Sequence, residues 1–240
     1  MNTTAMMKLN ARQKQVLKVI VEEYVKHSTA VGSSHVVEML AESVSPATIR
    51  NVMVELTDFG LLAQPHTSAG RIPTEIGFKA YIETMMREQK ELSHRQQEVL
   101  SAHFKRLKSL QERFREAARM LSELSGSVGL LIDEQDKVYM SGLSNLPRLP
   151  EFRDEEFGSD FMELLENPAE SLKQMTKGGS SQMRVLLGSD NPMVGNASIV
   201  ITKFGLGGKK MISIIGPMRM SYGKTLPTME YITKILNNEL

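Results

Sequence analysis

Apolar residues recur at three- and four-residue steps through the first ninety positions, which is the spacing of one face of an α-helix. The first helix is expected after Asn10, with Gln13 three positions on as in a capping box. Gly32 interrupts the pattern before a second, short helix, and Ser45 with Pro46 opens a third. The apolar positions of these helices are Val16, Leu17, Ile20, Val21, Tyr24 and Val25, then Val36, Val37 and Leu40, then Ile49, Val52, Met53 and Leu56.

A β-hairpin is predicted directly after the third helix. The segment LLAQPHTSAGRIP (61–73) contains two short apolar runs separated by small polar residues, with Pro65 and Gly70 confining the loop. Another amphipathic helix follows Thr74, and it is expected to bury Phe78, Tyr81, Ile82, Met85 and Met86. Three helices followed by a hairpin is the order of a winged helix-turn-helix, so residues 1–87 are assigned to such a DNA-binding domain.

Residues 88–124 carry a helical pattern with many charges and are interpreted as a helical linker. Between Arg95 and Arg119 there are seven Lys or Arg residues against three Glu. A solvated helix face explains this best, and a contact with flanking DNA or a coiled-coil dimer seam are the alternatives. The apolar stripe consists of Phe104, Leu107, Leu110, Phe114 and Met120.

Residues 125–240 are predicted to form an α+β domain. Strands are expected at SVGLLID, KVYMSGL, QMRVLLG, ASIVITKF and KMISIIGPMR, with Gly205, Gly207 and Gly208 turning the chain between the last two. A helix interrupted at Pro168 follows the second strand, and a closing helix covers TMEYITKILNNEL.

Composition and the absence of catalytic motifs argue against an enzyme. The chain has no cysteine and five scattered histidines, which excludes thiol chemistry and leaves no metal-ligand spacing. FGLGG lacks the Lys-Ser/Thr of a phosphate loop, and Ser141 has no nucleophile-elbow pattern around it. No catalytic residue, cofactor or metal is expected. Because neither a signal peptide nor a membrane span is apparent, the expected location is the cytoplasm.

The third predicted helix carries the residues that suit base recognition in the major groove. The face opposite its apolar stripe presents Ala47, Thr48, Arg50 and Asn51. Arg50 can donate to guanine O6 and N7, Asn51 can pair with adenine N6 and N7, and Thr48 can reach a base or a thymine methyl. The residues expected to contact phosphate or form the wing are Ser33, Ser34, Ser45, His66, Thr67, Ser68 and Arg71. Winged helices also dock proteins, so a protein-interaction module remains an alternative.

Several segments resemble the family of the heat-inducible transcription repressor HrcA. They include SPATIRNVMVELTDFGLL, HTSAGRIPTEIGFKAYIETMM and GLGGKKMISIIGPMRMSYGKTLPTMEYITKIL, in this order. The resemblance implies a dimer bound to an inverted-repeat operator upstream of chaperone genes, inactivated by heat shock and dependent on the GroE chaperonin. Thr48, Arg50 and Asn51 match the family's recognition helix, and Ser68, Gly70 and Arg71 match its wing.

The chain departs from the family pattern in its middle. Family members carry a GAF-like domain interrupted by an inserted dimerising domain, whereas here SVGLLIDEQDKVYMSGL passes almost directly to a late element. A reduced GAF-like domain is therefore expected, with the helical region 87–124 contributing more to self-association. The alternative function is a small-molecule-responsive regulator with a ligand pocket in the C-terminal domain.

Overall fold

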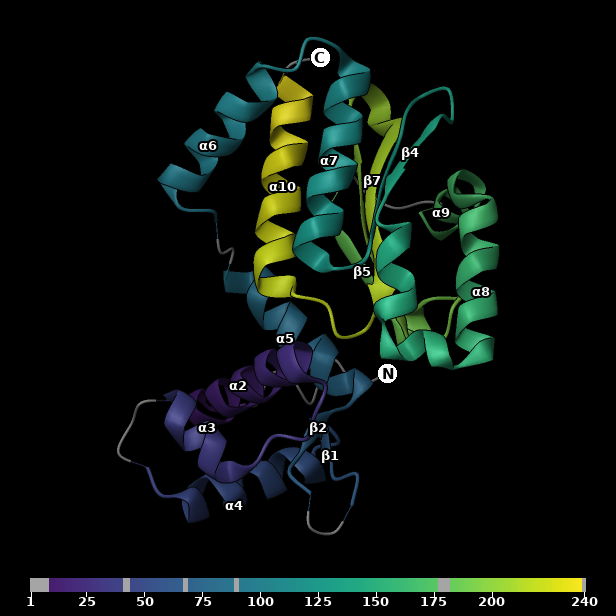
Figure 1. The fold of residues 1–240 in the computed structure, drawn as a ribbon. Helices are drawn as coiled ribbons and strands as arrows, with labels where there is room; N and C mark the ends of the chain where they lie inside the picture. The colour runs from purple at the N-terminus through teal and green to yellow at the C-terminus, as the bar shows by residue number, and fades with distance from the viewer. Residues whose placement is uncertain (1–8, 41–43, 67–68, 89–90, 177–181, 239–240) are drawn as a thin grey trace. The chain divides into compact units, whose positions relative to one another are not determined.

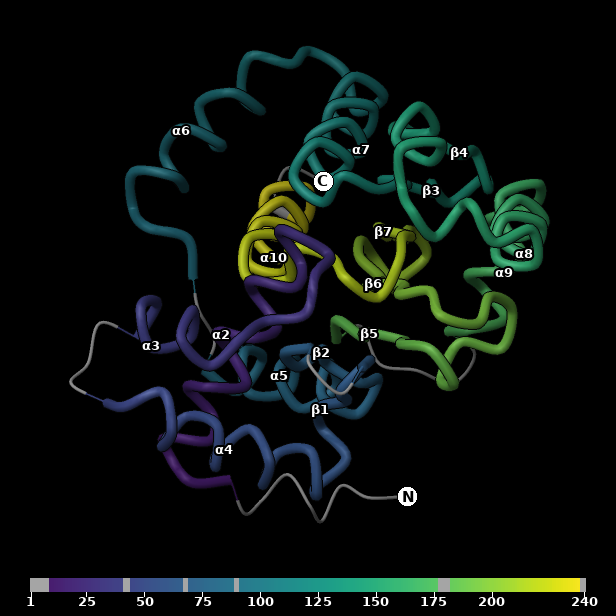
Figure 2. Tube along the Cα trace, turned by 60° about the horizontal axis from the view of Figure 1, so that its bottom comes forward, coloured from purple at the N-terminus to yellow at the C-terminus, as the bar shows by residue number. Residues whose placement is uncertain are grey.

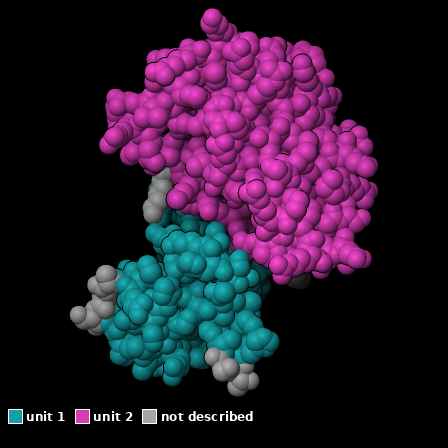
Figure 3. Space-filling view, viewed as in Figure 1, with its two compact units in different colours: residues 1–89 teal, residues 90–240 magenta. Residues whose placement is uncertain are grey.

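The computed structural model describes residues 9–40, 44–66, 69–88, 91–176 and 182–238. The chain divides into two compact units, Met1–Gln89 and Lys90–Leu240 (Figure 3). The architecture is α+β, with a winged helix-turn-helix first, as the sequence predicts. Within the described ranges, none of the helices has the length and apolar character needed to traverse a lipid bilayer.

The described part of the first unit contains four helices and a short hairpin. Helix α2 covers Ala11–His27, α3 covers Ser33–Leu40 and α4 covers Pro46–Asp58. Strands β1 (Leu62–Ala63) and β2 (Ile72–Pro73) pair antiparallel, and α5 (Glu75–Glu88) follows them. The predicted apolar stripes supply the core, since Ile20, Val36, Ile49 and Leu56 are each fully inaccessible to solvent.

The second unit contains a five-stranded antiparallel sheet in the order β4-β3-β7-β6-β5. The strands are β3 (Val128–Ile132), β4 (Val138–Ser141), β5 (Arg184–Leu187), β6 (Ala197–Phe204) and β7 (Lys210–Pro217). The helices are α6 (His94–Lys105), α7 (Leu110–Ser125), α8 (Glu155–Glu166), α9 (Pro168–Met175) and α10 (Tyr222–Asn238). Short 3₁₀ segments cover Leu143–Arg148, Pro150–Arg153, Gly188–Asp190 and Leu206–Gly208.

Helices cover both faces of this sheet (Figures 1 and 2). Alternate side chains of β3 point to opposite faces, so Val128, Leu130 and Ile132 join the core that includes Phe161 of α8 and Leu172 of α9. Helices α7 and α10 lie side by side on the other face. There α7 approaches the sheet closely, because a Cβ on Gly129 would lie 2.2 Å from the carbonyl oxygen of Ala118.

Three details differ from the expectations drawn from the sequence. The stretch expected to be a linker forms two helices of the second unit, of which α7 packs on the sheet and buries Phe114. Met86 is 39% exposed instead of buried, because it lies on the outer side of α5. The last helix begins at Tyr222, six residues early, since Pro227 is accommodated inside it instead of marking its start.

Candidate nucleic-acid interface

Helix α4 presents one polar face to solvent and buries the other. Ile49, Val52, Met53 and Leu56 are buried, as predicted. On the opposite face Ala47, Thr48, Arg50 and Asn51 are all exposed. Residues 47–51 span little more than one helical turn of 3.6 positions, and the exposed Val54 extends this face into the next turn. It is therefore a compact surface that fits the width of a major groove.

The N-terminus of α4 is fixed by a side-chain cap. Ser45 Oγ accepts a hydrogen bond from the Thr48 backbone N–H at 3.1 Å and lies 3.0 Å from Thr48 Oγ1. Pro46 occupies the first helical position, where its lack of an N–H costs nothing. The hydroxyl of Thr48 is thus engaged with the cap. Ser45, expected at a phosphate, has a structural partner of its own.

Arg50 and Asn51 are the free polar side chains of this face. Among the described residues, neither has a hydrogen bond or ion pair within the chain, so the guanidinium and the carboxamide can both be directed at a ligand. The later part of the helix carries two exposed acids, Glu55 and Asp58. Glu55 accepts a 2.8 Å hydrogen bond from Gln13 Nε2 of α2. Because these carboxylates repel phosphate, contact with DNA would be confined to the first turns of α4.

The wing is extended by a third short strand segment. Val31, between α2 and α3, forms an antiparallel bridge with Arg71, and each backbone N–H donates to the other's carbonyl at 2.9 Å. Gly70 permits this approach, since a Cβ there would stand 2.2 Å from the Val31 carbonyl oxygen. The hairpin is thereby attached to the loop that precedes α3.

Arg71 also anchors the wing to the recognition helix. Its Nε donates to Thr57 Oγ1 at 3.0 Å, and that hydroxyl donates in turn to the Met53 carbonyl at 2.8 Å. The sequence predicts Arg71 as a wing residue that contacts the DNA backbone or the minor groove. In the structure the side chain is half-buried and holds β2 against α4, leaving only the terminal nitrogens for another partner.

The remaining candidate residues lie at the start of α3 and along the hairpin loop. Ser33 and Ser34 begin α3, where the first backbone N–H groups have no intrahelical acceptor; Ser34 is exposed and Ser33 half-buried. His66 is exposed, and its carbonyl accepts a hydrogen bond from the Ala69 N–H at 2.9 Å. Thr67 and Ser68 lie outside the described residues.

A charged cluster between α2 and α3 was not found from the sequence. The buried carboxylate of Glu23 contacts Lys26 and lies 2.7 Å from His35 Nε2. Hydrogen bonds from His35 and Lys26 hold the pKa of Glu23 below its ordinary value, and the Glu23 contact raises the pKa of His35. The cluster fixes the first helix of the helix-turn-helix pair to α2. A histidine near the start of a predicted helix does not by itself indicate a contact with a carboxylate twelve positions earlier in the chain.

The second unit shows structural polar contacts instead of a second candidate site for chemistry. Across the described ranges, no group of three or more His, Cys, Asp or Glu side chains is arranged to hold a metal ion. Arg219 binds Glu151 through two hydrogen bonds of 2.6 and 3.0 Å, which join the loop after β7 to the 3₁₀ segment Pro150–Arg153. Asn145 Nδ2 donates to Ser122 Oγ and to the Ser127 carbonyl, each at 3.1 Å.

Comparison with known families assigns both units consistently. Residues 8–89 match the model of the winged helix-turn-helix transcription repressor, HrcA DNA-binding. Residues 79–226 match the model of the HrcA protein C-terminal domain.

Individual relatives agree with these matches. The chain is 42% identical over 131 residues to the heat-inducible transcription repressor HrcA of Thermomicrobium roseum, an alignment covering 54% of this chain and 37% of that protein. It is 26% identical over 340 positions to the HrcA protein of Pelotomaculum thermopropionicum, covering 98% and 97% of the two chains. That alignment is longer than the chain itself, so the relative carries segments with no counterpart here.

A solved structure shares the fold. It is described as a hypothetical protein at 2.2 Å resolution, and it superposes with a TM-score of 0.78 at 19% identity, covering 96% of this chain and 98% of the other.

Proposed function

The chain belongs to the HrcA family of heat-inducible transcription repressors, and from this premise we propose that it represses heat-shock genes by binding operator DNA through its first unit. In this proposal α4 enters the major groove, Arg50 and Asn51 donate to base edges, and Ala47 with the Thr48 methyl makes apolar contacts. Repression follows from occupying the promoter, which requires no reaction at the protein, so the protein is proposed to act without enzymatic activity or cofactor.

One observation carries the proposal more than any other. Arg50 and Asn51 stand exposed on adjacent positions of a capped helix whose other face is buried, and among the described residues nothing in the chain engages them. An arginine and an asparagine held in this way match the two commonest bidentate patterns of base recognition. The wing, whose base is attached to α4 through the hydrogen bond between Arg71 and Thr57, supplies a second surface beside the first.

Phosphate contacts in this proposal come from the edges of the reading face. Ser33 and Ser34 offer hydroxyls at the N-terminal end of α3, where the helix dipole favours an anion. His66, Thr67 and Ser68 belong to the hairpin loop, and Arg71 contributes the guanidinium nitrogens that Thr57 does not occupy. Such contacts set the register of the protein on the duplex and carry little sequence information.

The partners proposed for this protein are an inverted-repeat operator, a second copy of the chain and the GroE chaperonin, all in the cytoplasm. A two-fold operator follows from pairing two copies of α4, since a symmetric dimer presents its recognition helices in opposite directions along the duplex. The domain scheme is part of the proposal: a reduced GAF-like C-terminal domain without most of the family's inserted dimerising domain.

Selection of bound fragments from a random pool of duplex DNA tests this function directly. The expected product is an enriched inverted repeat whose half-sites carry a conserved guanine and a conserved adenine. A pool that remains random after several rounds, at a salt concentration that suppresses non-specific binding, would contradict the proposal. The same selection with Arg50→Ala should lose preference at one position of each half-site.

A further inference from the structure

The second unit contains an apolar groove that no part of the described chain fills. It encloses about 460 Å³ between α6, α7 and α10. Its apolar lining consists of Leu92, Val99, Leu100, Met120 and Leu124. Val99 is 63% exposed, which is unusual for a β-branched apolar residue in the middle of a helix. An exposed apolar strip of this kind, bordered by charges, is typical of a surface that is covered by a partner.

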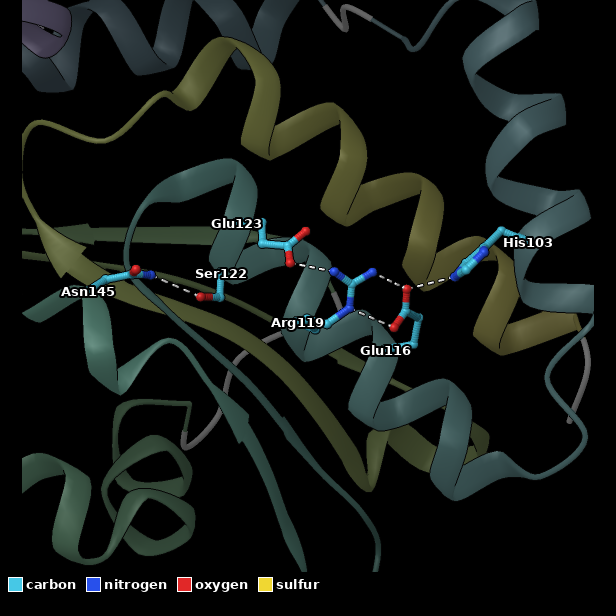
Figure 4. Close-up of polar contacts among 6 residues, drawn as sticks. All are labelled: His103, Glu116, Arg119, Ser122, Glu123 and Asn145. Carbon is cyan, nitrogen blue, oxygen red and sulfur yellow. Dashed lines mark hydrogen bonds and ion pairs between the residues drawn. The ribbon is translucent and has the colours of Figure 1, made fainter.

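Helix α6 is attached to the rest of the unit mainly beyond this groove. Figure 4 shows the contact between His103 and Glu116 of α7. His103 Nε2 lies 2.7 Å from Glu116 Oε1, and Ser101 Oγ lies 2.8 Å from Tyr231 Oη of α10. Phe104 is fully buried one position later. The first half of α6 has no comparable polar tie to α7 among the described residues, so the two helices form the walls of an open channel there.

Arg95 on the α6 wall and Glu123 on the α7 wall carry opposite charges, and Arg119 lines the α7 wall as well. Arg95 on α6 is exposed, and no acidic partner for it occurs in the described part of the chain. On α7 the Glu123 side chain is 61% exposed and, among the described residues, pairs with Arg119 alone, which binds Glu116 as well (Figure 4). Arg119 therefore has its charge balanced within α7, whereas Arg95 has not. A surface with a free cation on one wall and an accessible carboxylate on the other is complementary to itself under a two-fold rotation.

We propose that a second copy of this chain closes the groove, with α6 of each protomer packing against α7 of the other. Val99 enters the partner's groove, and Arg95 faces the partner's Glu123. The inference rests on the proposed function, which needs two copies of the recognition helix. It places the dimer contact on α6 and α7 instead of on an inserted dimerising domain. The apolar strip supplies the buried centre of the interface and the charges select the two-fold register.

Sedimentation equilibrium of the full chain tests the apolar part. The wild type is expected to be dimeric, and Val99→Glu should raise the dimer dissociation constant at least tenfold, because it places an unpaired carboxylate in the contact. Since Val99 is 63% exposed in the single chain, this variant should retain its far-ultraviolet circular dichroism. The matched control is Met162→Glu on α8, a 50% exposed apolar residue far along the chain, which should leave the dissociation constant unchanged.

A mixing experiment tests the charged part. Arg95→Glu alone should disfavour the dimer, because the new carboxylate of one protomer faces the Glu123 carboxylate of the other. Glu123→Arg alone should disfavour it as well, because the new guanidinium group faces that of Arg95. When these two variants are mixed in equal amounts, a heterodimer regains an opposite-charge pair at both contacts, so dimer should reappear only in the mixture. No contact within one chain can produce this result, because neither chain carries both changes.

The outcomes separate this inference from the proposed function. A wild type that is monomeric at tens of micromolar, a Val99→Glu variant that dimerises normally, or a small molecule occupying the groove in native mass spectrometry of the monomer would each overturn the inference. DNA binding is measured independently: Val99→Glu should bind a single half-site as tightly as the wild type and the full operator less tightly. Loss of half-site binding by the wild type itself would instead refute the proposed function.

Discussion

Arg71 of the wing donates a hydrogen bond from Nε to the hydroxyl of Thr57, 3.0 Å away on the last turn of α4. The two residues are fourteen positions apart in the chain. Their contact links the base of the wing to the recognition helix, so the two surfaces proposed to touch DNA are joined by a side-chain hydrogen bond.

Thr57→Val should uncouple the wing while keeping the volume of the side chain. Loss of this hydrogen bond is expected to cost about 1 kcal/mol in local stability, since the Arg71 donor is half-buried. Hydrogen-exchange mass spectrometry should show faster exchange over residues 69–73, and affinity for all DNA sequences should fall by a similar factor. Thr84→Val, which removes a hydroxyl bonded to a carbonyl within α5, is the control and should change neither. Unchanged exchange in the Thr57 variant would mean that the contact does not order the wing.

Arg50→Ala should weaken binding to the selected operator by about 1–3 kcal/mol and relax specificity at one base pair of each half-site. The protein should remain folded, because the residue is exposed and alanine is the stronger helix former. Lys14→Ala removes the same charge from α2, beside α5, and should leave specificity intact. Fluorescence anisotropy against operators substituted one position at a time measures both effects. Equal losses on every substituted operator would assign Arg50 to phosphate instead.

Two substitutions at Ser45 distinguish its capping role from a role at DNA. Ser45→Ala should destabilise the first turn of α4 by about 1 kcal/mol, measured as faster amide exchange at residues 47–49. Ser45→Asp keeps a capping acceptor and favours the helix dipole, yet brings a negative charge toward phosphate. We therefore expect normal exchange with reduced DNA affinity. Ser109→Asp at the equivalent cap of α7 should leave affinity unchanged, and equal affinity for wild type and Ser45→Asp would place Ser45 away from the backbone of DNA.

The contact between Glu23 and His35 should make the attachment of α3 depend on pH. Because the pKa of His35 is raised in the folded protein, its contribution is complete below its ordinary value of 6.5 and is lost as the pH rises through the raised value. Because the pKa of Glu23 is lowered, its contribution is present above 4.5 and is lost as the pH falls through the lowered value. The contact is therefore strongest between these two ordinary values.

His35→Gln provides the test. Protection of the α3 amides should fall more at about pH 5.5 than at about pH 8.5 relative to the wild type, after correction for intrinsic exchange rates. His66→Gln on the exposed hairpin loop is the control, and it should alter α3 protection at neither pH. A His35 effect of the same size at both pH values would show that charge is not what joins α3 to α2.

Patterns that depend on neighbouring residues were readable from the sequence, and those that depend on distant ones were not. The Ser45 cap, the Asn10 and Gln13 capping box and the buried stripe of α4 all involve residues within a few positions of one another. The inward tie of Arg71 needs Thr57 from another element, and the contact of His35 needs Glu23. The supposed linker reads as solvent-exposed because its charges are numerous, although Gly129 allows α7 to lie directly against β3. Because Gly129 has no side chain, the sequence does not indicate that a helix packs against this position.

The brevity of the polar face on α4 has a consequence for how a site could be found in a genome. The candidate base-reading residues 47–51 occupy little more than one turn of α4, and the carboxylates of Glu55 and Asp58 follow them, so one protomer can inspect only a few base pairs. A half-site of only a few base pairs recurs very often among the roughly 10⁶ or more competing positions of a genome. Sequence specificity must then come also from the distance and orientation between two half-sites. The spacing of the paired protomers therefore contributes to operator recognition alongside the base contacts.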